Sequence, residues 1–240
     1  MDVAREWVNA GRHAPPFWVL ADEQTAGRGR QGRGWRSLPG NLHATGVFAT
    51  ARPLHELPSL ALVAGLAVID TVIPQLMQPD RLRLKWPNDV LLGERKLAGI
   101  LCESERRERD ALVLVGIGVN LAHAPRDVDL PATALASEGV VPPAPETFLF
   151  RLARVFAHLQ QSWEASGFAA LKARYEQWMW GRGQKVVISD ETAGEGRIAG
   201  ELAGIDEDGA LLLETAAGRV RVVSGRLRLH NAPSHGGRAP

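Results

Sequence analysis

The pattern of the chain changes near residue 183, and this change limits the possible folds more than any other feature. Before it, apolar strand-like runs alternate with long helical segments. After it, from 184 to 229, four or five short β runs are separated by turns of Gly, Asp and Glu, at spacings that suit a small barrel. We expect an α+β fold in which a mixed-sheet domain at 1–182 is followed by a small β-barrel at 183–230 and a flexible tail at 231–240.

Composition restricts the class of protein. The 240 residues include 28 Lys and Arg against 27 Asp and Glu, a net charge of +1 that argues against a surface coating nucleic acid or anionic membrane. The single cysteine, Cys102, excludes an internal disulfide framework and a Cys-based zinc site. We find no secretory signal, and the apolar stretch 56–77 is interrupted by Asp70. These features predict a cytoplasmic protein that binds neither DNA nor membrane.

Periodicity and turn signals predict the elements of the first domain. The helix expected at 58–76 is apolar almost continuously, which predicts that it is buried. Asp2 is placed to cap the first helix. The other expected helices cover 2–10, 131–138, 146–165 and 168–179, and the expected strands cover 17–21, 42–50, 81–86, 90–92, 97–103 and 111–121.

The segment 24–36, QTAGRGRQGRGWR, holds four glycines and four arginines without periodicity and is therefore expected to be a loop. Glycines allow the backbone to approach a ligand closely, exposed N–H groups can surround an anion, and arginines offer forked donors to phosphate or carboxylate. These properties favour a loop that closes over an anionic ligand. Alone, the segment also fits an RGG-like RNA-binding tract, a solvated loop or a linker. It matches neither P-loop nor Rossmann spacing.

Two further segments carry polar groups next to expected strands. Only four of the 28 basic residues are lysines, and Lys85 and Lys96 fall within one twelve-residue window, on either side of a tight turn. Asp89 between them can hold a lysine or bind Mg²⁺, although an ordinary hairpin with edge lysines fits as well. The run 116–120, GIGVN, places two glycines inside a strand. Such glycines mark close approach of a ligand or a bulge in a core strand, and Asn120 can pair with the edge of adenine.

Taken together, the motifs QTAGRGRQGRGW, KWPNDV, RKLAGIL and VGIGVNL, with GIDEDGALLLE after them, resemble those of the biotin protein ligases in order and spacing. The resemblance covers about residues 2–230. It implies a class II synthetase-like (lipoate–biotin ligase-like) catalytic domain and an SH3-like C-terminal barrel. It also implies an enzyme that forms biotinyl-5′-AMP from biotin and MgATP and then transfers biotin to a lysine of a biotin carboxyl carrier protein domain of a carboxylase. A homodimer is compatible with this reading.

The resemblance also implies roles for individual residues. The catalytic residues would be Lys96, Arg28 and Arg30, with Lys96 holding the biotin carboxylate and stabilising charge at the reacting oxygens. Asp89 would hold the metal. The remaining ligand-binding residues divide by substrate: Gln24, Gly27 and Arg28 for biotin, Gly29 and Arg30 for the adenylate, Trp35 as a cover of the nucleotide, Lys85, Asn88 and Asp89 for ATP, and Asn120 for adenine, with Gly118 as a further ligand-binding position.

Two departures from the family pattern lead to further expectations. Some members carry an N-terminal DNA-binding repressor domain, which we do not expect here. The family's Ser-Thr-Asn segment, which contacts the ureido ring of biotin, should precede the first helix, whereas this sequence starts at Met1 within that helix. We therefore hypothesise that Met1 is an internal position of a longer chain and stands where the Asn of that segment would be.

Two other functions compete with this interpretation. A lipoate–protein ligase would share the fold and the adenylation chemistry, but the Gly/Arg loop and the C-terminal barrel motif favour biotin. A nucleic-acid-binding protein that uses the Gly/Arg loop would leave the two-lysine hairpin and the GIGVN strand unexplained.

Overall fold

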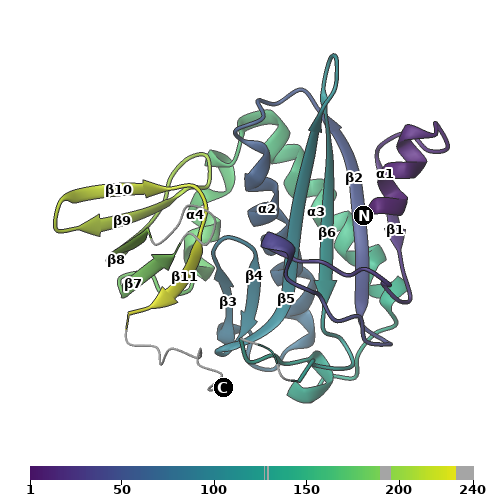
Figure 1. Ribbon diagram of the computed structural model, residues 1–240. Helices are drawn as coiled ribbons and strands as arrows, with labels where there is room; N and C mark the ends of the chain where they lie inside the picture. The colour runs from purple at the N-terminus through teal and green to yellow at the C-terminus, as the bar shows by residue number, and fades with distance from the viewer. Residues whose placement is uncertain (127, 129, 190–195, 231–240) are drawn as a thin grey trace, which may run out of the picture.

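The computed structural model describes residues 1–126, 128, 130–189 and 196–230, and it confirms the α+β architecture (Figure 1). The chain forms a six-stranded sheet covered by helices and then a separate five-stranded sheet. The flexible tail expected at 231–240 lies outside the described residues.

The first sheet has the strand order β1-β2-β6-β5-β4-β3, and all of its strand pairs are antiparallel. Among the described residues, the parallel pairs are two isolated bridges outside the named strands, Leu84 with Met179 and Lys96 with Ala132. The strands expected from the sequence form, and they pair with one another in antiparallel fashion. The strands are β1 Phe17–Leu20, β2 Leu42–Thr50, β3 Leu82–Lys85, β4 Asp89–Leu92, β5 Arg95–Arg106 and β6 Ala111–Val119.

The helices also lie close to their expected positions. They are α1 Asp2–Asn9, α2 Leu60–Val72, α3 Pro145–Ser166 and α4 Ala169–Trp178. The segment expected as a short helix at 131–138 forms only a 3-10 turn, Leu135–Glu138, and 3-10 turns at Leu57–Ser59 and Ile73–Gln75 flank α2.

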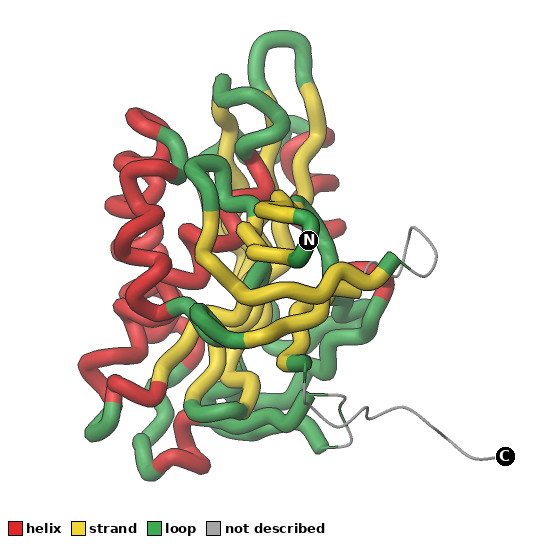
Figure 2. The backbone as a smooth tube through the Cα atoms, turned by 90° about the vertical axis from the view of Figure 1, so that its left-hand side faces the viewer, coloured by secondary structure: helices red, strands yellow, loops and turns green. Residues whose placement is uncertain are grey.

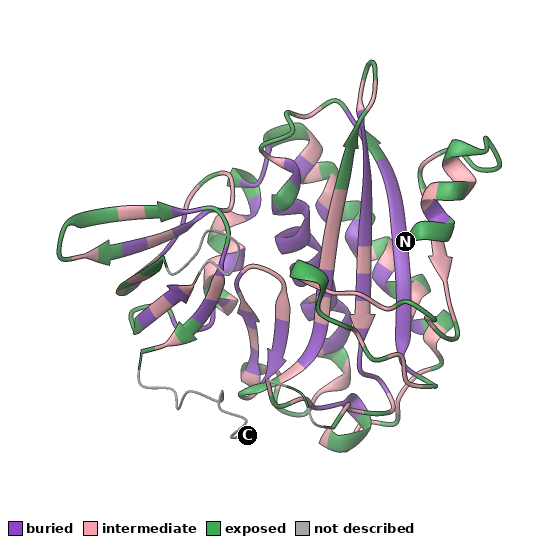
Figure 3. Ribbon diagram, viewed as in Figure 1, coloured by how far each residue is buried: buried purple, intermediate pink, exposed green. Residues whose placement is uncertain are grey.

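One face of the six-stranded sheet carries the main core. Helices α2 and α3 pack on this face, and both lie on the same side of the sheet in Figure 2. Helix α2 is buried along nearly its whole length because it lies between the sheet and α3, as its colour in Figure 3 shows. The segment Leu57–Gln75 is long and apolar enough to cross a bilayer by composition alone. Its packing makes it the central core helix of this fold.

The opposite face of the sheet is only partly covered. Helix α1 packs there through Ala4, which contacts a small cluster that includes Val47, Leu112 and Leu114. Residues two apart share a face of a strand, so Gly116 and Gly118 lie on the same face as Leu112 and Leu114. Further along β6, this face therefore carries glycines in place of apolar side chains. The uncovered half of the sheet is therefore shallow enough to accept a ligand or an aromatic ring.

The second sheet packs against the end of the first domain beside β3 and β4 (Figure 1). The indole Nε1 of the buried Trp86 donates to the carbonyl oxygen of Gly209 at 3.0 Å, and the Ile205 N–H donates to the Glu176 carboxylate at 3.2 Å. The strand order β10-β9-β8-β7-β11 is consistent with the SH3-like fold expected from the sequence. Its strands are β7 Lys185–Ser189, β8 Arg197–Ile205, β9 Leu211–Thr215, β10 Gly218–Val222 and β11 Arg226–Leu229.

Candidate active site

Three glycines on neighbouring strands form the floor of the candidate site. Gly99 of β5 pairs with Gly118 of β6, and Leu101 pairs with Gly116, so all four residues lie on the face opposite the main core. A Cβ atom added at Gly118 would overlap the indole ring of Trp35, and one added at Gly99 would lie 2.8 Å from the same ring. The floor therefore depends on the absence of side chains at these positions.

The Gly/Arg segment forms a short hairpin above this floor. The Gly29 N–H donates to the Arg33 carbonyl at 2.6 Å, and the Trp35 N–H donates to the Gly27 carbonyl at 2.9 Å. A 3-10 turn at Arg30–Gly32 makes the tip, where Gln31 has a positive φ of 56°. The sequence predicted a loop here, but not that it pairs with itself and places Trp35 at its base.

Trp35 is held on the glycine floor from two sides. Its indole Nε1 donates to Nδ1 of the buried His43 at 3.4 Å, while His43 Nε2 lies 3.3 Å from the Leu38 carbonyl oxygen. This pairing assigns the ring proton to Nε2 and leaves Nδ1 as the acceptor. Burial lowers the pKa of His43, which favours the neutral ring that accepts this bond. Sequence reasoning missed His43, although it lies across from Gly118 on β2.

The two lysines of the hairpin occupy different surroundings. Lys96 Nζ lies 2.6 Å from Asp89 Oδ1 in an ion pair, and 5.5 Å from the ring centre of Trp35. Lys85 Nζ lies 4.9 Å from the ring centre of Trp180. Burial lowers the pKa of Lys85, and Asp89 opposes that shift. Both lysines thus lie near Asp89, as the sequence predicted, but only Lys96 faces the glycine floor.

Two asparagines hold the ends of the strands around the site. Asn88 exchanges hydrogen bonds with Ile100: its Nδ2 donates to the Ile100 carbonyl at 3.0 Å, and its own carbonyl accepts from the Ile100 N–H at 2.9 Å. Asn120 is buried and donates through Nδ2 to the Thr133 carbonyl at 3.0 Å. Its Oδ1 is buried without a hydrogen-bond partner in the structure. Buried polar atoms without a hydrogen-bond partner are uncommon in folded proteins, which sets this oxygen apart.

Two arginines of the loop contact other parts of the protein. Arg28 pairs with Asp2 and Glu103, so Asp2 lies in α1 with its carboxylate directed at Arg28 and does not cap the helix as expected. Arg30 NH1 reaches the carbonyl oxygen of Gly225 in the second sheet at 3.4 Å.

A pocket opens where the loop, the floor and the hairpin meet. Its lining includes seven of the twelve predicted site residues and does not include Gly27, Arg30, Lys85, Asp89 and Asn120. A Cβ added at Gly27 would lie 2.4 Å from the Trp35 carbonyl oxygen, so the loop is tightly packed there. The pocket is lined by Met1, Gln24, Arg28, Gly29, Trp35, Asn88, Lys96, Gly99, Ile100, Leu101, Gly116, Ile117 and Gly118.

Sequence reasoning did not assign a role to several of these lining residues. The Sδ atom of Met1 would lie 2.9 Å from a Cβ at Gly116, so Met1 covers that end of the floor. The sequence had already marked Gly116 as one of two glycines inside a strand, and a glycine within the strand expected at 97–103 was the signal that could have identified Gly99. Across the described ranges, no group of three or more His, Cys, Asp and Glu side chains is arranged to hold a metal ion.

Comparison with models of protein families shows which class of protein the chain resembles. The model of the biotin/lipoate A/B protein ligase family matches residues 2–120, and that of the biotin protein ligase C-terminal domain matches residues 183–226. These matches cover the pocket-bearing sheet and the second sheet, respectively.

Individual relatives narrow this class. The biotin–[acetyl-CoA-carboxylase] ligase of Paracoccus denitrificans is 38% identical over 214 residues, which cover 84% of this chain and 85% of the relative. The biotin protein ligase of Aquifex aeolicus in complex with biotin and ATP superimposes with a TM-score of 0.74 at 30% identity, covering 90% of this chain and 91% of that structure. A Leishmania major biotin protein ligase in complex with biotinyl-5-AMP gives a TM-score of 0.61 at 26% identity, with 92% and 93% covered. The chain belongs to the biotin protein ligase family, which confirms the resemblance drawn from its motifs.

Proposed function

We propose that this chain activates biotin with ATP to form biotinyl-5′-AMP and then transfers biotin to a lysine of a biotin carboxyl carrier protein domain. The observation that carries the proposal is the Lys96–Asp89 ion pair beside a glycine floor covered by Trp35. The curated relative from Paracoccus denitrificans is named for this reaction on acetyl-CoA carboxylase, and the Aquifex aeolicus structure holds biotin and ATP.

The two steps need no covalent nucleophile from the protein. In the first, an oxygen of the biotin carboxylate attacks the α-phosphorus of ATP and pyrophosphate leaves. In the second, the amine of the carrier lysine attacks the carbonyl carbon of the mixed anhydride, and AMP leaves. Both nucleophiles belong to substrates, so the enzyme contributes by positioning the reactants, placing positive charge and excluding water.

Most of the predicted site residues have a place in this scheme. Lys96 lies at the floor and supplies positive charge to the reacting oxygens, and Asp89 holds its ammonium group. Trp35 provides a flat face for the nucleotide. The unpartnered Oδ1 of Asn120 suits the amino group of adenine. Positions for the biotin end are proposed at Gln24 and Gly27, positions for the adenylate at Gly29 and Arg30, and positions for ATP at Lys85 and Asn88. Gly118 is proposed as a ligand-binding position of the floor.

A magnesium ion fits this site only as part of the ATP substrate. Mg²⁺ commonly uses one or two protein carboxylates together with substrate phosphates and water. Asp89 is the one carboxylate that we assign to it, and Lys96 would have to share that group. We further propose action without DNA binding and a cytoplasmic location, on the grounds given with the sequence.

ATP–pyrophosphate exchange tests the function directly. Biotin and lipoate are supplied separately as the acid, and incorporation of labelled pyrophosphate into ATP is measured. Exchange that depends on biotin is expected. Exchange with lipoate alone would overturn the proposal in favour of a lipoate ligase. The absence of exchange with both acids would show that the protein does not catalyse the adenylation step.

A further inference from the structure

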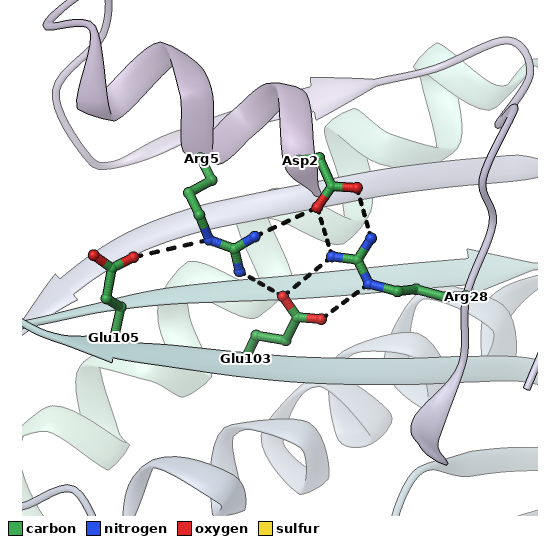
Figure 4. Close-up of polar contacts among 5 residues, drawn as sticks. All are labelled: Asp2, Arg5, Arg28, Glu103 and Glu105. Atoms are coloured by element: carbon green, nitrogen blue, oxygen red, sulfur yellow. Dashed lines mark hydrogen bonds and ion pairs between the residues drawn. The ribbon is translucent and has the colours of Figure 1, made fainter. Parts of the chain in front are cut away.

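Five charged side chains meet where the Gly/Arg loop, helix α1 and strand β5 come together (Figure 4). At the centre is Arg28, whose NH1 and NH2 groups each lie 2.6 Å from an oxygen of Asp2. Its Nε lies 3.2 Å from Glu103 Oε1. We name Asp2, Arg28 and Glu103 the charged clamp. All three nitrogens of the Arg28 guanidinium are directed at carboxylates, so this group is committed within the protein.

Arg5 completes the arrangement around the clamp. Its NH2 group lies 2.5 Å from Glu103 Oε2, and its NH1 group lies 3.4 Å from Asp2 Oδ1. Each carboxylate of the clamp is therefore shared by two arginines. Burial raises the pKa of Glu103, but hydrogen bonds from Arg28 and Arg5 outweigh it and lower the pKa overall. The clamp stays ionised at neutral pH.

The clamp fixes the base of the loop hairpin on the same face of the sheet as the glycine floor. Glu103 follows Gly99 and Leu101 at two-residue intervals along β5, so all three share that face. Arg28 lies one residue from Gly27, whose carbonyl accepts from the N–H of Trp35. The hairpin base is thus tied at two points, through Arg28 to the clamp and through Trp35 to the floor.

The clamp contributes more to loop position than to folding. The Asp2 side chain is 63% exposed and the Glu103 side chain 27%. Ion pairs with this much solvent contact contribute little to global stability, because water screens them and ordering long side chains costs entropy. Their effect is local, on a segment that crosses the pocket.

We propose that Asp2 and Glu103 are positioning residues that hold the Gly/Arg loop over the pocket through Arg28 and so retain the adenylate until transfer. This inference rests on the proposed function. It also assigns Arg28 a role different from direct contact with biotin through its guanidinium: the backbone of Gly27–Gly29 faces the ligand, and the Arg28 side chain anchors that backbone.

The test uses the isosteric variants Glu103→Gln and Asp2→Asn, with Glu105→Gln as the matched control. Glu105 lies two residues further along β5, and among the described residues its recorded ion pair is with Arg5 at 3.8 Å and not with the loop. The first readout is trypsin cleavage after Arg30 and Arg33, located by mass spectrometry. It needs no enzymatic activity. We expect Glu103→Gln to be cleaved at least about fivefold faster in the loop, the change in open-loop population that ~1 kcal/mol produces.

The second readout is the ratio of biotin found on albumin to biotin found on the carrier domain. Free adenylate labels albumin, so we expect this ratio to rise at least about fivefold in Glu103→Gln and in Asp2→Asn. A ratio is insensitive to the fraction of enzyme that is folded. Glu103→Asp, which keeps the charge, should bring both readouts back toward the wild type.

The outcomes separate this inference from the proposed function. Unchanged loop cleavage in both variants, an unchanged labelling ratio, or equal effects of Glu105→Gln would each overturn the clamp. A wild-type protein without biotin-dependent exchange would instead overturn the proposed function, while the trypsin readout would still report whether the clamp holds the loop.

Discussion

At the scale of single residues, Lys96 combines the contacts expected of a charge-stabilising group. It reaches the glycine floor, lies near the Trp35 ring and pairs with Asp89. We predict that Lys96→Ala lowers the rate of biotin-dependent ATP–pyrophosphate exchange at least about a hundredfold, the scale of losing one stabilising donor in a transition state. Lys185→Ala, at an exposed lysine of β7, serves as the control. A folded Lys96→Ala protein with near-normal exchange would remove Lys96 from the catalytic residues.

His43 leads to a prediction about pH. Burial lowers the pKa of His43 in the folded protein below the ordinary 6.5, which applies to the unfolded chain. At a pH between the folded-state and the unfolded-state pKa, the unfolded chain therefore binds more protons than the folded protein. Its contribution to stability is therefore complete above about pH 6.5 and decreases as the pH falls through that window. We predict that the wild type loses more of its free energy of unfolding than His43→Asn does when the pH is lowered from about 7 to about 5.

Denaturant unfolding at several pH values measures this difference. His123→Asn, at an exposed histidine, should leave the dependence of the free energy of unfolding on pH as it is in the wild type. Parallel slopes for the wild type and His43→Asn would show that His43 does not titrate differently in the folded protein. The same protonation would convert Nδ1 into a donor facing the Trp35 N–H, so the Trp35 contact should weaken over the same range.

At the scale of elements, strands β5 and β6 work as a pair because their glycines face the same side. A methyl group at Gly118 would overlap Trp35, and the ring would have to leave the floor. We predict that Gly118→Ala raises the KM for ATP about 5- to 100-fold, which corresponds to the ~1–3 kcal/mol typical of overpacking. Gly196→Ala, where an added Cβ meets no atom of the described residues within 4 Å, is the control. An unchanged KM would mean that the floor does not carry the nucleotide.

The loop tip is a second element with a separable role. Arg30 reaches across to Gly225 of the second sheet, whereas Arg33 pairs with Gln31 inside the loop at 2.9 Å. We predict that Arg30→Gly still forms the adenylate but releases it, with at least about tenfold more biotin on albumin, since a charge-assisted contact contributes about 1.5–3 kcal/mol. Arg33→Gly should show much less release. Equal labelling by wild type and Arg30→Gly would exclude a sealing role for Arg30.

Much of this element structure could be predicted from the sequence. Strand Leu42–Thr50 has the limits that the sequence predicted. Helix α2 lies within the expected range 58–76 and is buried, because a helix that is apolar on all sides is stable only in the core. The residues that could not be predicted depend on tertiary contacts. His43 shows no local pattern that marks it as the partner of Trp35. Glu103 is one of several acidic residues in its segment, and only the folded arrangement of β5, α1 and the loop distinguishes it from the others.

At the scale of the whole molecule, the second sheet contributes to the surroundings of the site. Burial lowers the pKa of Lys85, and Arg226 and Arg228 of β11 lower it further while Asp89 opposes them. The Arg30 contact with Gly225 joins the loop to the same sheet. The position of this sheet therefore affects both the loop and the lysine hairpin. Contacts that hold the second sheet against the first domain should for this reason influence ligand binding in the pocket.

Gly209 is the position where this locking is most easily tested. Its carbonyl oxygen accepts from Trp86, its φ is +92°, and an added Cβ would lie 2.7 Å from Leu62 and 3.2 Å from Ser59 of the first domain. Gly218 has a similar φ of +106°, but within the part of the chain that the structure describes no atom lies within 4 Å of an added Cβ. The pair therefore separates backbone strain from a clash between the two parts of the fold.

We predict that Gly209→Ala lowers the free energy of unfolding by about 1–3 kcal/mol more than Gly218→Ala, because only the first combines strain with overpacking. Denaturant unfolding of both variants measures the difference. We also expect Gly209→Ala to raise the KM for ATP in the exchange assay and Gly218→Ala to leave it unchanged, since only a displaced second sheet alters the surroundings of Lys85. Equal destabilisation by the two substitutions would mean that the sheets are held together elsewhere, and the functional link through this contact would then fail.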